Sequence, residues 1–337
     1  MEFHDPFQSR RRPAAVSIPA ARALTPLGQL EWYLPGVIAR PGLNLVLSTF
    51  WFNQISALLD LAVCAALGVP WLGRPLHQAA VLWFFEPRSQ HGLFKRLGQV
   101  MRAHHAPAEL PFRLAAINNY YDLYRASFLN LLSAEVERTG AALVIFESMA
   151  CLPPGLKEDD LDPLRLAIFK LQTYAVSTNT AVVLLHDHRQ PDLLAANPHV
   201  NAYIDHLLTL RAAAHTDYLE IRGRPSADYP DGLALAARIH FDPDFHHPER
   251  VWLTPAALSQ ARYALSAKRP PSPAVEHVLD YLTDHGPSIT KRIIESAPNA
   301  TRSQIFKAIY KLIDAGLIKR IDSGGWGQTA TYALVEE

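Results

Sequence analysis

The sequence predicts an α/β fold with a mostly parallel sheet, helices on both of its faces, and a small second domain at the C-terminus. One observation is a series of short runs that are apolar on both faces, a pattern typical of strands buried inside a parallel sheet. A second is that helical segments separate these runs, which predicts right-handed crossovers. A third is a change of pattern after residue 272, where three helical segments precede two strands.

The expected core strands and helices alternate along the first half of the chain. The strands are residues 43–47, 81–85, 143–146 and 182–185, and the helices are residues 55–67, 92–104, 121–139 and 163–177. Ligands of such sheets bind at the carboxyl ends of the strands. We therefore expect the residues at those ends to share one edge of the sheet, namely Ser48, Glu86, Glu147 and His186.

Composition indicates a soluble globular chain of about two domains, since 49% of the 337 residues are hydrophobic and the formal net charge is zero. Cys64 and Cys151 lie in apolar runs, which favours reduced thiols in the cytoplasm. No apolar stretch approaches the roughly 18 residues of a membrane span. Residues 1–30 lack the apolar core of a secretory signal and are interpreted as an N-terminal arm.

Several segments, in this order, resemble the core of RecA-like P-loop ATPases of the RepA hexameric helicase kind. Residues 32–48 resemble the approach to the first core strand, and residues 79–97 resemble the second strand with Glu86 at its end and Arg96 downstream. Residues 140–152 resemble the Walker B strand, where Glu147 takes the place of the usual Asp. The resemblance spans roughly residues 30–245, and it implies a RecA-like domain over residues 31–265.

The phosphate-binding motif of that family is missing. A working loop reads G-x-x-x-x-G-K-[ST], in which backbone N–H groups, a Lys and a hydroxyl hold phosphate and Mg²⁺. Aromatic residues 50–52 crowd the aligned segment. Ser48 and Asn53 occupy the two glycine positions, Gln54 occupies the Lys position, and Ile55 occupies the hydroxyl position. We therefore expect a degenerate Walker A motif and no bound nucleotide cofactor.

The remaining strand-end residues have roles that the resemblance implies. Glu86 would activate the attacking water, Glu147 would orient Mg²⁺, and His186 would sense the γ-phosphate. Without the Lys and the hydroxyl we interpret them as vestigial, and the alternative is a metal or nucleotide held in an unusual arrangement. His186, Asp187 and His188 offer no convincing third ligand of a zinc site, so no metal is expected.

Residues 219–241 resemble the late hairpin whose K-x-R pair reaches into the neighbouring subunit of that family. Arg222 and Arg224 would be this pair, acting in trans on transition-state charge. The alternative is that both are ordinary exposed arginines of a hairpin. Residues 266–272 are rich in Pro and charge and are expected to form a linker.

Residues 273–337 resemble a winged helix-turn-helix domain. Helices are expected at 273–285, at 289–297 with Ser288 as its cap, and after a Thr301 cap. The strands 317–322 and 329–335 would form the wing, and the phrase IYKLIDAGLIKR is similar to the passage into the wing in that family.

Basic side chains of this domain point to duplex DNA as the partner. They lie away from the apolar stripe of the third helix or beside the wing, where they would meet a groove or phosphates. The expected contact residues are Arg302, Ser303, Lys307, Lys311, Lys319, Arg320 and Trp326. The alternative is a winged helix used for protein contact.

The sequence thus predicts a non-catalytic DNA-binding protein whose degenerate core serves as an assembly platform. Its partners would be double-stranded DNA and RecA-like subunits, in a homo- or hetero-oligomer, with no membrane. Replication, transcription control, or a mobile-element or defence complex would fit. One alternative is an active ATPase or helicase subunit, working alone or with a catalytic partner. Another is a structural subunit whose domains both bind protein.

Overall fold

The fold is described from a computed structural model of the chain. The described residues are 32–48, 51–85, 87–116, 126–147, 161–187, 202–213, 216–226, 228–242, 249–266, 272–298, 300–322 and 330–335. The predicted arm, residues 1–30, lies outside these ranges, and so do residues 267–271 of the predicted linker.

A nine-stranded sheet forms the centre of the protein, with the order β11-β10-β9-β8-β3-β7-β6-β4-β5. The six strands from β8 to β5 in this order are parallel. All seven residues of β3 (Gly42–Ser48) are buried, because β7 and β8 flank it and helices cover it. The other parallel strands are β4 (Ala80–Phe85), β5 (Phe112–Ala116), β6 (Ala141–Phe146), β7 (Ala181–Asp187) and β8 (His206–Ala212).

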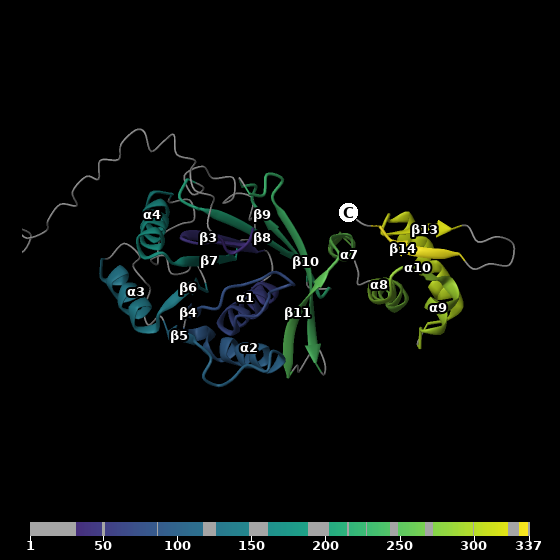
Figure 1. Cartoon of the computed structure of the whole chain (residues 1–337), viewed down its shortest axis with the longest axis horizontal. Coiled ribbons are helices and arrows are strands. Elements are labelled where there is room, and N and C mark those ends of the chain that lie inside the picture. The colour runs from purple at the N-terminus through teal and green to yellow at the C-terminus, as the bar shows by residue number, and fades with distance from the viewer. Residues whose placement is uncertain are drawn as a thin grey trace, which may run out of the picture.

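Helices cover both faces of the sheet (Figure 1). Residues of α1 (Trp51–Leu67) and α2 (Gln90–Ala103) pack with Val46 on one face. Residues of α3 (Ala126–Thr139) and α4 (Leu161–Thr178) pack with the alternate β3 residues Leu43, Leu45 and Leu47 on the other. This arrangement confirms the predicted α/β class, and the four core strands and four helices expected from the sequence are all present.

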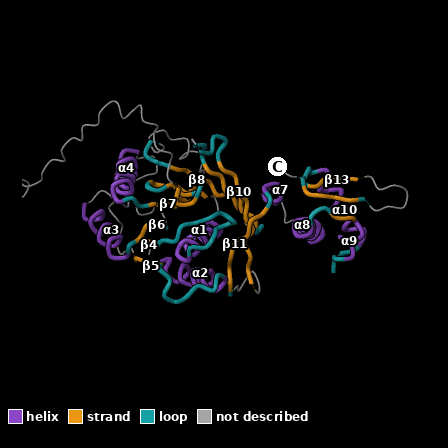
Figure 2. Tube along the Cα trace, viewed as in Figure 1, coloured by secondary structure: helices purple, strands orange, loops and turns teal. Residues whose placement is uncertain are grey.

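An antiparallel extension continues the sheet beyond β8. β9 (Tyr218–Gly223) and β10 (Leu233–Asp242) form the predicted late hairpin, and β11 (Arg250–Ala256) adds an outer edge strand that the sequence did not reveal. β5 and β8 were also not predicted. Figure 2 shows the long β10–β11 pair beside α1 and α2. A separate small hairpin, β1 (Trp32–Leu34) and β2 (Ile38–Ala39), precedes the sheet.

The residues that the structure describes between 272 and 335, here called the C-terminal module, follow α7 (Leu258–Ser266). α8 (Pro273–His285) has the predicted bounds and ends at Gly286, whose φ of 68° suits glycine. Thr301 caps α10 (Arg302–Asp314) in a capping box with Gln304, as the sequence predicts. The remaining elements are β12 (Ser288–Ile289), α9 (Thr290–Glu295), β13 (Ile318–Asp322) and β14 (Thr331–Leu334).

The predicted cap of the second helix of the module is wrong. Ser288 lies in β12 and pairs with Tyr332 of β14, and its hydroxyl donates to the carbonyl of Gly286. Helix α9 therefore begins one residue later than predicted, at Thr290, with Ile289 at its N-cap. Ser288 pairs in a strand and does not cap the helix, because β12 completes a three-stranded sheet, β12-β14-β13.

Polar contacts attach the C-terminal module to the antiparallel extension. Arg238 of β10 donates to both carboxylate oxygens of Asp280 in α8, at 2.9 and 3.0 Å, and to Asp217 at 2.7 Å. Gln260 of α7 donates to the Thr283 hydroxyl of α8 at 2.8 Å. Tyr263 of α7 packs against the apolar core of the module. Searching the described ranges for a helix long and apolar enough to cross a membrane finds none.

Candidate functional site

The carboxyl edge of the parallel strands brings the predicted strand-end residues together. Ser48 closes β3, and in the pairing with β7 it lies opposite Asp187, one position beyond the Leu47–His186 pair. Glu147 follows β6, where its N–H donates to the carbonyl of Phe84 in β4 at 3.0 Å. The side chains of Ser48, Glu147 and His186 are buried. Glu86 and His188 lie outside the described residues.

The connection between β3 and α1 differs from the loop expected from the sequence. β3 ends at Ser48 and α1 begins at Trp51, so two residues separate strand and helix. Trp51, Phe52 and Asn53 are therefore helical, although they were assigned to a crowded loop by the ungapped alignment. A phosphate loop needs four residues between its glycines before the helix carries the Lys. The segment here is shorter because α1 extends toward the strand.

Two residues at phosphate-loop positions are part of the apolar interior. Ile55, at the position of the Mg²⁺-binding hydroxyl, packs in the core beneath α1. Gln54, at the Lys position, is 0% exposed. Within the part of the chain that the structure describes, neither Oε1 nor Nε2 of Gln54 has a hydrogen-bond partner. A buried amide without partners is a source of instability.

Glu147, at the Walker B position, is engaged by neighbouring protein groups. The Ser89 hydroxyl donates to its Oε2 at 2.8 Å. Arg96 of α2 is the basic partner: burial lowers the pKa of its guanidinium, and the charge of Glu147 acts in the opposite direction. Arg96, downstream of Glu86 in the sequence, thus interacts electrostatically with Glu147, the residue at the expected Walker B position.

The two arginines of the late hairpin have different surroundings. Arg224 donates to the backbone carbonyls of Ile204 and Asp205, at 2.7 and 3.3 Å, and so holds the segment that leads into β8. Arg222 donates Nε and Nη2 to Oε1 of Glu220, at 2.9 and 2.8 Å. Arg222 keeps half of its side chain exposed. The two arginines therefore have different partners, and their action in trans stays a prediction.

The predicted DNA-contact residues of α10 lie on its exposed side. Ser303 and Lys307 are exposed opposite the buried stripe of Ile305, Ile309 and Leu312. Arg302 places its guanidinium 5.6 Å from the ring centroid of Phe306. Lys311 is exposed, and its Nζ lies 5.7 Å from the ring centroid of Tyr263 in α7.

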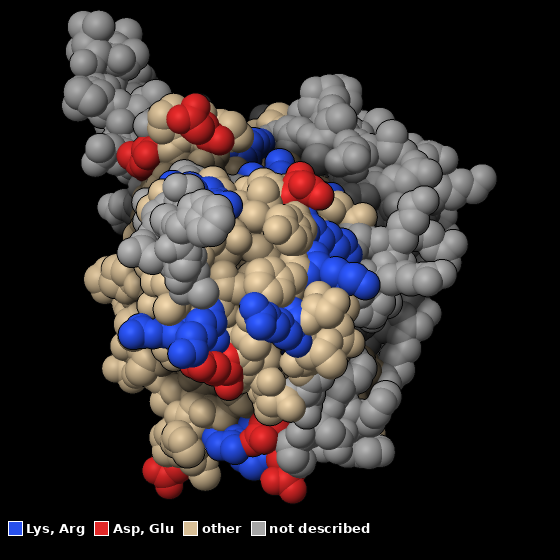
Figure 3. Space-filling model, turned by 90° about the vertical axis from the view of Figure 1, so that its right-hand side faces the viewer, with Lys and Arg blue, Asp and Glu red and all other residues tan. Residues whose placement is uncertain are grey.

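The side chains of β13 add to this surface. Lys319 and Arg320 are exposed, and Trp326 lies outside the described residues. Seen from the end of the molecule that carries the module, Lys and Arg side chains lie in several groups across the face (Figure 3).

One exposed aromatic residue of α10 was missed by the sequence reasoning. Tyr310 is 62% exposed and follows Lys307 by one helical turn, on the polar side of the helix. The signal was available, because a helix of this register places residues 303, 307 and 310 opposite the apolar stripe. A base or a deoxyribose could stack on such a ring.

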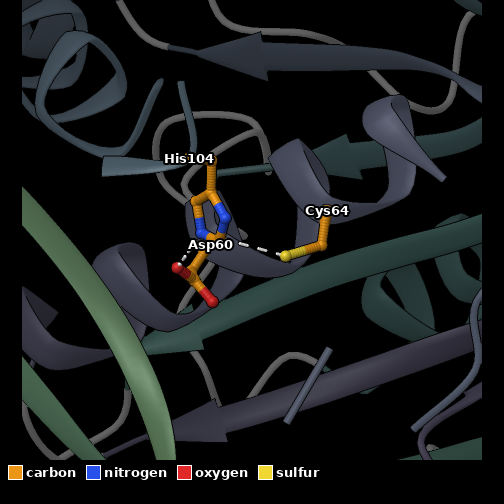
Figure 4. Close-up of side chains that lie close together, drawn as sticks. All are labelled: Asp60, Cys64 and His104. Carbon is orange, nitrogen blue, oxygen red and sulfur yellow. Dashed lines mark hydrogen bonds and ion pairs between the residues drawn. The ribbon is translucent and has the colours of Figure 1, made fainter. Parts of the chain in front are cut away.

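Asp60, Cys64 and His104 form the one group of potential metal ligands found among the described residues, with ligand atoms within 4.8 Å of one another (Figure 4). The Nε2 of His104 lies 2.8 Å from Oδ1 of Asp60 and 3.9 Å from Sγ of Cys64. Leu253 of β11 donates its N–H to the same Oδ1 at 3.4 Å.

The chemistry of this group favours a structural role. Burial raises the pKa of the Asp60 carboxyl, although the hydrogen bond and the charge of His104 act to lower it. Burial and the Asp60 charge raise the pKa of the Cys64 thiol, which keeps it protonated. A structural zinc site takes four ligands, and this group offers three among the described residues. Its hydrogen bonds join α1, the end of α2 and β11.

Comparison with known proteins gives one family and one structural likeness to report. A family model described as an AAA domain matches residues 9–192. A solved structure described as "Crystal structure of the RadB recombinase" aligns with a TM-score of 0.48 and 15% identity over 65% of this chain and 93% of that chain. No curated protein matches.

Gln54→Met should stabilise the protein, because it removes an amide that is buried without partners and keeps the side-chain volume. We expect the free energy of unfolding to rise by about 1–3 kcal/mol, measured by thermal or urea unfolding. The matched control is Gln260→Met, which removes the hydrogen bond to Thr283 and should destabilise. A loss of stability in Gln54→Met would show that the amide has a partner in solution.

His104→Ala should destabilise the protein by about 3 kcal/mol, because it leaves the buried Asp60 without its charge partner. The neighbouring His105 is exposed, and His105→Ala should change the free energy of unfolding by less than about 0.5 kcal/mol. Equal effects of the two substitutions in urea unfolding would refute the structural role of the Asp60–His104 pair.

Proposed function

The chain belongs to the AAA domain family, and we propose that it is a DNA-binding protein whose core keeps the framework of an ATPase but does not hydrolyse ATP. In this proposal the core is an assembly platform, and the C-terminal module is a winged helix that holds duplex DNA. An active ATPase subunit is the competing function, and it is tested directly below.

The short β3–α1 connection is the observation that carries the non-catalytic part of the proposal. Two residues separate Ser48 from the first residue of α1. Phosphate binding needs a loop whose backbone N–H groups surround the phosphate, together with a Lys charge. A two-residue connection leaves little loop to surround a phosphate, and Gln54, at the Lys position in the first turn of α1, is buried and uncharged. The loss of both contributions at once removes most of the binding energy for a triphosphate.

The surroundings of Glu147 support the same conclusion. An oxygen that holds Mg²⁺ or its water must face the nucleotide. Here Oε2 accepts the Ser89 hydroxyl, and the Arg96 charge acts on the same carboxylate. A neighbouring arginine offsets the negative charge that would attract Mg²⁺.

The exposed side of α10 supports duplex DNA as the partner of the C-terminal module. Ser303, Lys307 and Tyr310 form a strip of hydroxyl, ammonium and phenol groups that a major groove can accommodate. If β13 is part of a wing, as proposed, Lys319 and Arg320 on this strand would contact backbone phosphates. Phosphate contacts supply affinity and base-edge contacts supply sequence preference.

Exposed apolar side chains on α3 and α4 support the assembly part of the proposal. These helices cover one face of the sheet and carry four large exposed apolar residues, which are Leu131, Leu166, Phe169 and Val176. Apolar residues gathered on one side of a soluble protein are typical of protein contacts. The partners would be RecA-like subunits, either copies of this chain or a different protein.

The protein should not bind ATP with a Kd below about 1 mM, a value that corresponds to about −4 kcal/mol. Titration calorimetry with ATP and Mg²⁺ measures this directly. A saturable micromolar Kd would contradict the proposal, as would ATP hydrolysis that is lost in Glu86→Gln. Either result would establish the active ATPase instead.

Lys307→Ala should weaken duplex binding and lower the slope of log K against log salt by about 0.9, since one phosphate contact is lost. Fluorescence anisotropy in a salt series measures both quantities. Lys95→Ala, on the exposed side of α2, is the matched control and should change neither.

Tyr310→Ala should weaken duplex binding while leaving the slope unchanged, because contacts of an uncharged side chain release no counterions. Unchanged binding in both α10 variants, with wild-type protein still bound to DNA, would show that the module does not hold the duplex and serves protein contact.

A further inference from the structure

A buried carboxylate in the antiparallel extension gathers three arginines. Glu220 of β9 is 0% exposed, and its Oε1 accepts from Arg222 at 2.8 Å and from Arg262 at 3.1 Å. Its Oε2 accepts from Arg211 at 2.9 Å. These four residues are called the arginine cluster below.

The fold brings the members of the cluster from three elements. Arg211 of β8 lies directly opposite Glu220 in the antiparallel register, and Arg222 lies two residues further along β9, on the same face of the strand. Arg262 comes from α7, which packs over β9. The guanidinium groups therefore surround the carboxylate on one face of the sheet.

Among the described residues, the cluster has more positive than negative charge, and its arginine side chains are about half open to solvent. Three guanidinium groups meet one carboxylate, and the exposed fractions of the arginine side chains are 53% for Arg211, 50% for Arg222 and 44% for Arg262. Each guanidinium carries five N–H donors, of which Arg211 gives one and Arg222 gives two to Glu220. Donors on a fixed planar group are suited to the oxygens of a phosphate.

Glu220 holds these groups in place as a charged residue. Burial raises the pKa of its carboxyl, but the hydrogen bonds from Arg222 and Arg262 and the charges of Arg222 and Arg211 outweigh burial, so the pKa lies below its usual value. The carboxylate is therefore ionised at neutral pH. Because Glu220 already orients the three arginine side chains, they lose less conformational entropy when they bind a ligand.

A second ionic group on the same extension has the opposite balance. Arg238 of β10 meets two carboxylates, Asp217 and Asp280, and its role is to attach the C-terminal module. The arginine cluster has more cations than anions and holds no element of the module. Its chemistry fits an anionic partner from outside the chain.

We propose that the arginine cluster binds the phosphate backbone of the duplex that the C-terminal module holds, as a second contact surface on the core. α7 connects the two surfaces: Lys311 of α10 places its Nζ 5.7 Å from the ring centroid of Tyr263, the residue that follows Arg262. The inference rests on the proposed binding of duplex DNA.

Arg211→Gln is the variant that tests the cluster with least disturbance, because Glu220 keeps Arg222 and Arg262. In fluorescence anisotropy with the full chain, we expect the slope of log K against log salt to fall by about 0.9. The factor by which the affinity falls between 50 and 200 mM KCl should then be about threefold smaller in the variant than in the wild type. Arg211→Lys should keep the slope while losing part of the affinity, since the charge remains without the planar fork.

Arg138→Gln is the matched control. Arg138 is also an exposed arginine paired with one glutamate, Glu135 of α3, but it lies on a helix remote from α7. It should leave affinity and slope unchanged. Thermal unfolding of each variant confirms that the fold is retained.

The outcomes separate this inference from the proposed function. Unchanged DNA binding in Arg211→Gln, with a reduced slope in Lys307→Ala, overturns the inference alone. Absence of wild-type binding at low salt overturns the proposed function. A change of mass by light scattering in Arg211→Gln without a change in DNA binding would make the cluster a protein interface, and the inference would be wrong.

Discussion

The burial of β3 between two parallel neighbours is the constraint on which the rest of the structure depends. Every residue of this strand is inside the protein, and its alternate side chains serve two different apolar layers. Once β3 occupies the centre, β6 and β7 must end at the same edge of the sheet. This places Glu147 and His186 at that edge. The edge is therefore fixed by packing of the sheet and does not depend on a bound nucleotide for its form. In the proposed function, this packing is what preserves the ATPase framework after loss of the phosphate loop.

The features that were predictable from the sequence are those that local pattern determines. β3, β4, β6 and β7 are apolar on both faces, so each reads as a buried strand, and Thr301 with Gln304 marks the start of α10 by a local hydrogen-bond pattern. β5 was missed because, as an edge strand, it exposes or half-exposes every residue and has no continuous apolar run. β12 was missed because only its pairing with β14 makes two residues a strand.

The candidate sites depend more on long-range pairing, which a single sequence does not contain. The positions of Ser48, Gln54 and Ile55 were identified by alignment to a motif, but the early start of α1 and the burial of the Gln54 amide needed the structure. From the sequence, Arg222 was predicted to act in trans. In the structure its partner Glu220 also accepts hydrogen bonds from Arg211, 9 positions before it, and from Arg262, 42 positions after it. Strand register and helix docking bring those residues together, and neither is encoded locally.

Hydrogen exchange followed by mass spectrometry, with separate additions of duplex DNA and of ATP with Mg²⁺, tests the central claim most directly. The account predicts that DNA slows exchange in α10 and in the β8–β9 strands, and that ATP leaves β3 and the first turns of α1 unchanged. Slower exchange in β3 and α1 on addition of ATP, without protection of α10 by DNA, would contradict it and identify a nucleotide-binding ATPase core.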